Sequence, residues 1–142
     1  MTSVIEELNE LLRRERGEVE AVAELIKEIR EADPDIAESA REALETASWS
    51  CQGLQHRIEW LGGTPTLDIA EHVEELEDRQ STKSKIEFLC GTQEADLAKT
   101  HSLLEKPILD KDTRNFLEDL LKAHKDTLKW CKTTLAEWEV RP

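Results

Sequence analysis

The chain has 142 residues, of which 36% are charged and 4% aromatic, and its formal net charge is −13. A charge this negative argues against nucleic acid or anionic lipid as partners, because both are recognised through basic patches. Scarce aromatic residues, glycine and proline, together with regularly spaced aliphatic residues, are atypical of β-rich folds. The composition therefore predicts one all-α domain over residues 1–142.

Three features of the sequence indicate a cellular location. No apolar run reaches the ~18–20 residues of a membrane span, and the opening residues lack the basic and apolar regions of a signal peptide. Cys51, Cys90 and Cys131 are odd in number and show no CxxC spacing. This pattern favours reduced thiols over a disulfide framework, so we expect a cytoplasmic protein without a membrane partner.

The first half of the chain predicts a helical hairpin. The stretch Ile5–Ile29 carries aliphatic residues at steps of three and four, interrupted near its middle by Glu15. Asp33-Pro34 breaks this helix and starts a second, expected from about Pro34 to Leu61 and ended by Gly62-Gly63. Because the connection is short, the two helices should pack antiparallel.

The second half predicts a crossover followed by another pair of helices. Residues 64–80 form the crossover, in which we expect a short acidic helix. A third long helix should span about Ser81–Glu105, and a fourth should run from Asp110 or Asp112 to about Val140. Four long helices with one long middle connection predict an up-down-down-up bundle of ferritin-like topology.

Each long helix loses its aliphatic character near its centre. The interrupting residues are Glu15, Cys51, Gln93 and His124. If they converge at mid-bundle they could form a ligand site, and Glu15, His124 and Glu94 are the candidate metal ligands. A structural ion pair between Glu15 and His124, a metal ion, and an organic ligand or thiol site all remain open at this point.

Several other residues have a predicted place on the surface. Trp49 and Trp60 share a helix face, with His56 between them, and this face lies opposite the core stripe that contains Cys51. We expect the two indoles either to form a homodimer interface or to be covered by the crossover. His72 and His101 stand beside acidic residues and are expected to be solvated.

Two segments resemble the bacterioferritins of the ferritin-like superfamily. LNELLRRE (Leu8–Glu15) is similar to their first helix, whose closing glutamate is an iron ligand, and HRIEWLGGTPTL (His56–Leu67) is similar to the end of their second helix. LKW (Leu128–Trp130) resembles an anchor in the last helix. The opening IEELNELL, Trp49, Cys51 and RIEWLGGTP are also similar to a family of small bacterial ferritin-like proteins of unknown function, which implies a fold and a cytosolic setting but no activity.

The resemblance implies that most of the di-iron ligand set is missing. Glu15 matches the first-helix ligand, but the Glu-x-x-His of the second helix falls on Ala47 and Ser50, and that of the last helix falls on His124 and Thr127. The third-helix glutamate falls near Gly91 to Glu94. A di-metal site needs several bridging carboxylates, so ferroxidase activity is not expected.

These features lead to one functional expectation and one alternative. The first is a non-enzymatic ferritin-like bundle that has lost its di-iron centre, binds no cofactor and acts through association, as a homodimer. The alternative is a metal- or thiol-dependent protein that uses a reduced mid-bundle site of Glu15, Cys51 and His124.

Overall fold

A computed structural model of the chain describes residues 3–139. Within that span the protein is all-helical, as predicted, with no β-strand. The helices are α1 (Val4–Ile29), α2 (Pro34–Trp60), α3 (His72–Glu77), α4 (Thr82–Leu104) and α5 (Lys111–Glu139). Their bounds lie within a few residues of those predicted, and the expected helix end at Val140 lies outside the described residues.

Side-chain caps explain where several helices begin. The Ser3 hydroxyl accepts a hydrogen bond from the Glu6 amide at the start of α1, and Ser81 accepts one from the Ser84 amide at the start of α4. Asp110 accepts one from the Thr113 amide before α5. Each cap satisfies one of the amides that a helix leaves without an internal partner.

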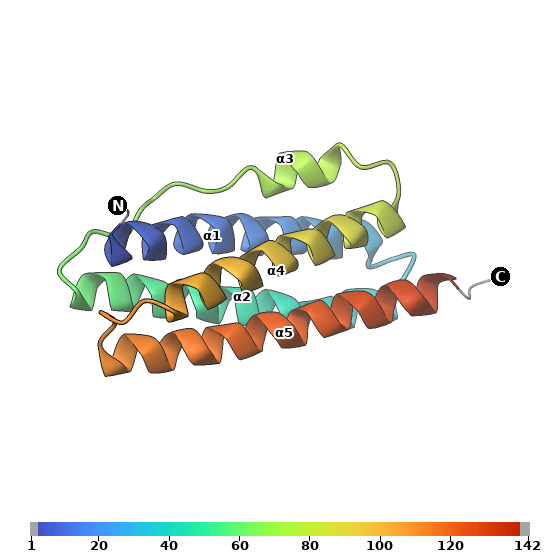
Figure 1. Cartoon of the computed structure of the whole chain (residues 1–142). Helices are drawn as coiled ribbons and strands as arrows, with labels where there is room; N and C mark the ends of the chain where they lie inside the picture. The colour runs from blue at the N-terminus through green and yellow to red at the C-terminus, as the bar shows by residue number, and fades with distance from the viewer. Residues whose placement is uncertain (1–2, 140–142) are drawn as a thin grey trace.

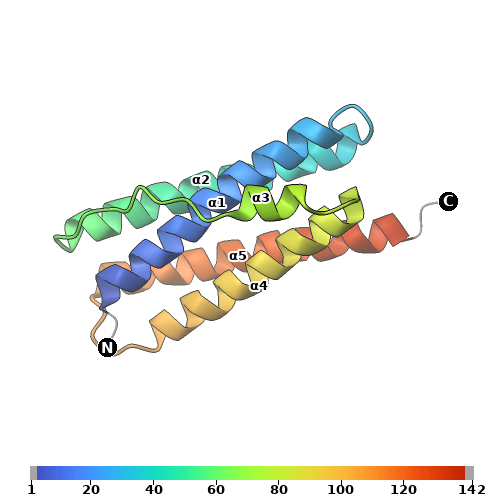
Figure 2. The same cartoon turned by 90° about the horizontal axis from the view of Figure 1, so that it is seen from above.

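The four long helices lie side by side, and the crossover runs along their outside (Figure 1). α2 runs antiparallel to α1, and the crossover carries the chain back along the bundle. As a result α4 runs in the same direction as α2, and α5 runs in the same direction as α1. Seen from above, the crossover leaves the end of α2 and crosses α1, and α3 lies between α1 and α4 and contacts both (Figure 2). Among the described helices, α3 makes no contact with α2.

Close backbone contacts fasten the crossover to α1. The Asn9 side chain donates to the Thr64 carbonyl and accepts from the Thr66 amide, while the Ala70 amide donates to the Arg13 carbonyl. A Cβ at Gly17 would lie only 2.8 Å from the Ala70 carbonyl oxygen. A glycine at position 17 thus permits the approach, at a cost of about 1 kcal/mol in helix propensity.

The core consists of two apolar clusters along the bundle axis. One lies around Leu25 and Ile86, and the other around Leu8 and Leu54. Between them the four long helices contribute buried polar side chains: Glu15, Glu18, Ser50, Thr92, Gln93, Asp96, His124 and Thr127. The sequence interruptions therefore correspond to a buried polar layer at mid-bundle.

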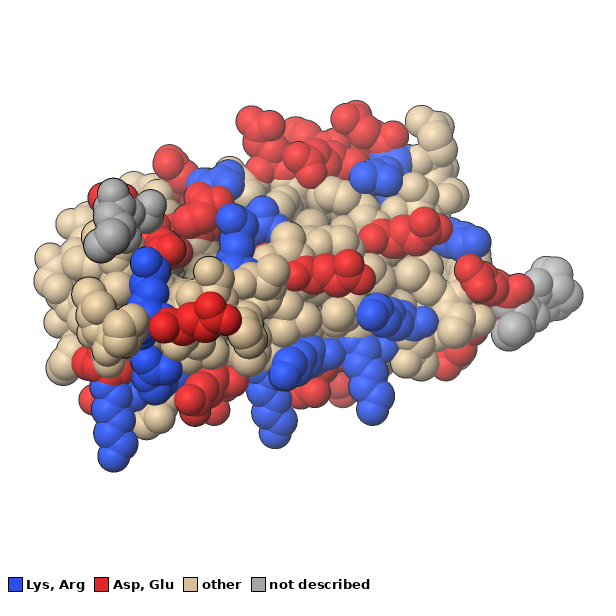
Figure 3. All heavy atoms as spheres, in the orientation of Figure 1, with Lys and Arg blue, Asp and Glu red and all other residues tan. Residues whose placement is uncertain are grey.

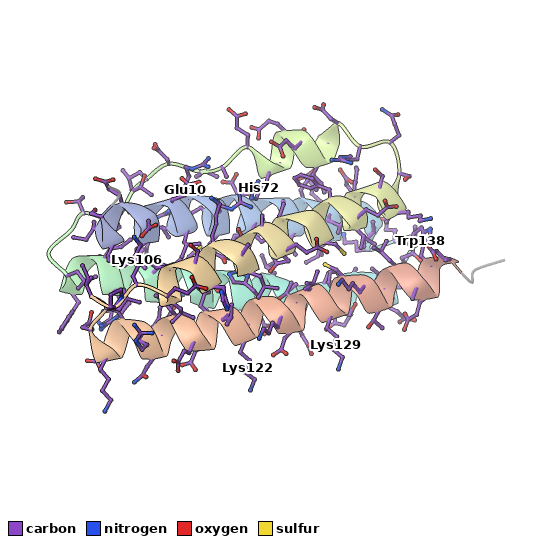
Figure 4. All side chains as sticks on the ribbon, viewed as in Figure 1. Glu10, His72, Lys106, Lys122, Lys129 and Trp138 are labelled. Atoms are coloured by element: carbon purple, nitrogen blue, oxygen red, sulfur yellow. The ribbon has the colours of Figure 1, made fainter. Side chains whose placement is uncertain are left out.

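Charge is unevenly distributed over the surface. Acidic side chains gather over α3 at the top of the space-filling view, while basic side chains project along its lower edge (Figure 3). Lys122 and Lys129 of α5 point away from the bundle there (Figure 4). Among the described residues, no helix combines the length and the apolar character needed to cross a membrane.

Candidate functional site

Glu15 and His124 meet at the centre of the polar layer. Oε1 of Glu15 on α1 lies 2.7 Å from Nε2 of His124 on α5, and both side chains are buried. The contact predicted from the sequence is therefore confirmed. Burial lowers the pKa of His124, but Glu15, together with Asp96 and Glu18, more than offsets this effect, so the pKa lies above its ordinary value.

A hydrogen-bonded chain orients the His124 ring. Its Nδ1 lies 2.9 Å from Oε1 of Gln93, whose Nε2 donates to Oε1 of Glu18 at 2.8 Å. With the Gln93 amide oriented in this way, Nδ1 of His124 carries a proton and donates it to the Gln93 carbonyl oxygen. The other ring nitrogen, Nε2, then faces the Glu15 carboxylate.

Glu18 completes this chain as a protonated acid. The Thr92 hydroxyl lies 2.9 Å from Oε2 of Glu18 and 2.8 Å from the Leu89 carbonyl oxygen, but it has only one proton to donate. All three groups are satisfied if Glu18 donates to Thr92 and Thr92 donates to Leu89. Burial, with the nearby Asp96 and Glu15, raises the pKa of Glu18 to about 8, which agrees with this proton placement.

Asp96 supplies a third buried carboxylate from α4. Its Oδ1 accepts a hydrogen bond from Nε of Arg14, while its Oδ2 is buried without a hydrogen-bond partner. Burial and Glu15 raise the pKa of Asp96 to about 6, against the opposing effects of His124 and Arg14. The sequence pattern predicted Gln93 and Glu94 as the site residues of this helix and did not identify Asp96.

Three of these buried side chains face one another. One donor atom each from Glu15, Asp96 and His124 lies within 4.8 Å of the others. Although Oε1 of Glu15 and Nε2 of His124 are close, they lack the alignment of a hydrogen bond, and neither has another hydrogen-bond partner among the described residues. Buried polar atoms without partners are rare in native proteins, so this cluster requires an explanation.

A small void adjoins the pair on the side of α2. Its volume is about 10 Å³, and Glu15, His124, Ser50 and Thr127 are among the residues that line it. A void of this size holds about one water molecule or ion. It is too small for an organic ligand.

The donor set suits one divalent cation. Imidazole nitrogen and carboxylate oxygen are ligands for zinc, manganese and iron(II). Two ligands bound at ~2.1 Å on opposite sides of an ion are ~4.2 Å apart, so shifts of about an ångström would bring the three donors around one ion. The Gln93 carbonyl oxygen already accepts from the other nitrogen of His124, as partners of metal-bound histidines do.

Two predicted ligands lie outside this cluster. Glu94 is exposed on α4, so its helix contributes Asp96 and Gln93 to the layer in its place. Cys51 is half-buried against the cluster around Leu8 and Leu54. Burial, and secondarily Glu15, raises the pKa of the Cys51 thiol to about 12, which keeps it protonated at neutral pH and weakens it as a nucleophile.

The two surface histidines have different outcomes. His101 is exposed and lies 3.2 Å from Glu105, as expected for a solvated side chain. The prediction for His72 is wrong, because this first residue of α3 is only 5% exposed and packs edge-on against Phe88 of α4. Burial, with Arg14 and Arg13 nearby, lowers its pKa to about 4, so the ring is neutral.

The predicted tryptophan face is exposed. Trp49 is 42% exposed and Trp60 57% exposed, and His56 is exposed between them. Trp49 packs against Phe116 at 5.5 Å between ring centroids, and the Arg57 guanidinium lies over the Trp60 ring. Because both indoles are exposed and α3 contacts α1 and α4 but not α2, the alternative in which the crossover covers the two indoles is wrong.

Comparison with protein-family models, curated proteins and solved structures found no match for this chain.

Proposed function

We propose that the protein binds one divalent metal ion at mid-bundle through Glu15, Asp96 and His124. The observation that carries this proposal is the convergence of donor atoms from three buried side chains, Glu15, Asp96 and His124, within 4.8 Å of one another. The adjoining void has room for one water as a further ligand and none for an organic substrate. The role that fits is non-enzymatic metal binding that ties α1, α4 and α5 together.

Elemental analysis after equilibrium dialysis against zinc, manganese or iron(II) tests this proposal. We expect one equivalent of metal per chain and a melting temperature that rises with metal concentration, since a ligand at 100 times its Kd adds about 2.7 kcal/mol. Asp96→Asn and His124→Ala should each abolish stoichiometric binding. Asp96→Asn keeps the shape of the side chain, so its loss of metal can be separated from unfolding.

His101→Ala is the matched control, because His101 is an exposed histidine beside a carboxylate on the same bundle. It should bind metal like the parent protein. Absence of stoichiometric metal from the parent protein would overturn the proposal and leave Glu15 and His124 as a structural ion pair. Glu15→Gln would then retain the fold without any change in metal content.

A second proposed role is association through the tryptophan face of α2. Exposed indoles at Trp49 and Trp60 favour it, because large apolar side chains gathered on one face typically mark an interface. A homodimer is the form we propose. This role is compatible with the metal site, which lies in the interior.

We also keep the ferritin-like assignment as a proposal. It is supported by Glu15 on the first long helix and by an order of helices in which the long crossover follows the second. With Asp96 and His124 as the remaining ligands, the centre would hold one ion in place of the lost di-iron centre. A bacterial, cytoplasmic origin belongs to the same proposal.

A further inference from the structure

Two hollows lead toward the buried layer from opposite sides of the bundle. One, about 820 Å³, lies beneath the crossover, and Arg13, Arg14 and Arg79 are among its lining residues. The other, about 70 Å³, lies in the seam between α2 and α5. A metal ion that reaches Glu15 and His124 must pass through the bundle surface. The side chains that line these two hollows therefore decide by which route the ion can enter.

The seam hollow reaches the void at the metal site. Ala43, Thr46 and Thr127 line both the hollow and the void of about 10 Å³ beside Glu15 and His124. The hollow and the void are therefore adjacent and share side chains from both α2 and α5.

The mouth of the seam hollow favours cations. Glu42 and Asp126 stand there with exposed carboxylates, and no lysine or arginine lines the hollow. Carboxylates at the mouth of a cleft raise the local concentration of cations and their association rate. Neither Glu42 nor Asp126 forms an ion pair among the described residues, which leaves both charges available.

Oxygen atoms continue inward from the mouth. Thr46 and Thr127 follow, and then Ser50, which is buried and donates its proton to the Thr46 carbonyl. The lone pairs of the Ser50 hydroxyl oxygen therefore stay available on the side of the void. Hydroxyl and carbonyl oxygens are suited to a partly dehydrated divalent cation.

The hollow beneath the crossover is unfavourable for the same ion. Exposed carboxylates stand at its rim, but Arg14 lies between the hollow and Asp96, with Nε bonded to Oδ1. A cation would have to pass this guanidinium at close range, where like charges repel strongly in a poorly solvated setting. The positive charge of Arg14 therefore disfavours this route, whereas the carboxylates of Glu42 and Asp126 favour the seam.

We propose that the metal ion enters through the seam between α2 and α5, captured first by Glu42 and Asp126. It then passes Thr46, Thr127 and Ser50 to reach Glu15 and His124. This inference rests on the metal site proposed above and adds to it the route and the capturing residues. The Trp130 indole, which donates from α5 to the Ser39 hydroxyl of α2 at 2.8 Å, holds the seam together at the hollow.

Stopped-flow mixing with cobalt(II) tests the route, because its visible absorption reports coordination directly. The double variant Glu42→Gln with Asp126→Asn should lower the association rate about tenfold at low ionic strength. The final spectrum and the stoichiometry should stay those of the parent protein, and added salt should narrow the difference in rate. Thr127→Val, which keeps the side-chain shape but removes the hydroxyl, should also slow uptake.

Gly91→Leu is the control for the opposite route. Gly91 lines the hollow beneath the crossover, and a Cβ there meets no atom within 4 Å, so a leucine can obstruct that space without a clash at its base. Uptake by Gly91→Leu should match the parent rate. Slower uptake in Gly91→Leu, or an unchanged rate in the double variant, would overturn the seam route while leaving the metal site in place. Absence of cobalt binding to the parent protein would overturn both.

Discussion

Glu18 makes the stability of the protein depend on pH, because it is an ionisable side chain inside the buried polar layer. Its carboxyl group is fully buried, and its pKa of about 8 stands well above the 4.5 of a free side chain. Between these two values the unfolded chain releases a proton that the folded chain keeps. Stability therefore falls as pH rises across this window, by up to about 1.4 kcal/mol per pH unit.

Glu18→Gln should remove this pH dependence. The amide can donate to Thr92 and accept from Gln93, so the hydrogen bonds are kept without an ionisable group. We expect a higher melting temperature than the parent protein, with a difference that is small near pH 4.5 and largest near pH 8. Thermal unfolding followed by circular dichroism at several pH values measures it.

Glu20→Gln is the control for this experiment, since Glu20 is exposed on the same helix. Its melting temperature should follow that of the parent protein at every pH. A melting temperature for Glu18→Gln that stays below the parent value near pH 8 would show that the carboxyl group is not held protonated.

At the scale of elements, Gly17 and Gly91 lie in the middle of helices but have opposite surroundings. Gly17 on α1 faces the crossover backbone, where a Cβ would lie 2.8 Å from the Ala70 oxygen. Gly91 on α4 faces open space. The close approach at Gly17 is a backbone contact that cannot move without loosening the crossover.

Alanine substitutions should therefore change stability in opposite directions. Gly91→Ala should stabilise the protein by roughly 0.5–1 kcal/mol through helix propensity alone. Gly17→Ala should destabilise it by about 1–3 kcal/mol, because the overpacking exceeds the same gain. Urea denaturation of the two variants gives both values, and shifts of equal sign would contradict the close approach at Gly17.

At the scale of the whole molecule, the exposed face of α2 determines the prediction for association. Trp49 and Trp60 are exposed on α2, which α3 does not contact. Indoles at the centre of an interface often contribute 2 kcal/mol or more each. Trp49→Ala with Trp60→Ala should therefore weaken a homodimer by at least about 100-fold.

Sedimentation velocity measures this prediction directly. The parent protein should sediment as a dimer and the double variant as a monomer at the same concentration. Leu67→Ala provides the control, since Leu67 is an exposed apolar residue on the crossover, away from this face. A parent protein that is already monomeric would refute the interface.

The sequence by itself determined the elements and one contact of the site. Aliphatic residues at helical spacing, the Asp33-Pro34 break and Gly62-Gly63 placed the long helices, because period and breakers are local properties of the chain. Interruption of that spacing at Glu15 and His124 predicted their meeting.

Only the tertiary structure decided the rest of the layer. It brought Asp96 and Glu18 into the interior and left Glu94 outside, because a polar residue at a helical position becomes buried only through the rotation of its helix against three others. It also buried His72, because its helix α3 packs on α1 and α4. That burial depends on how a long connection packs on α1, which no local pattern encodes.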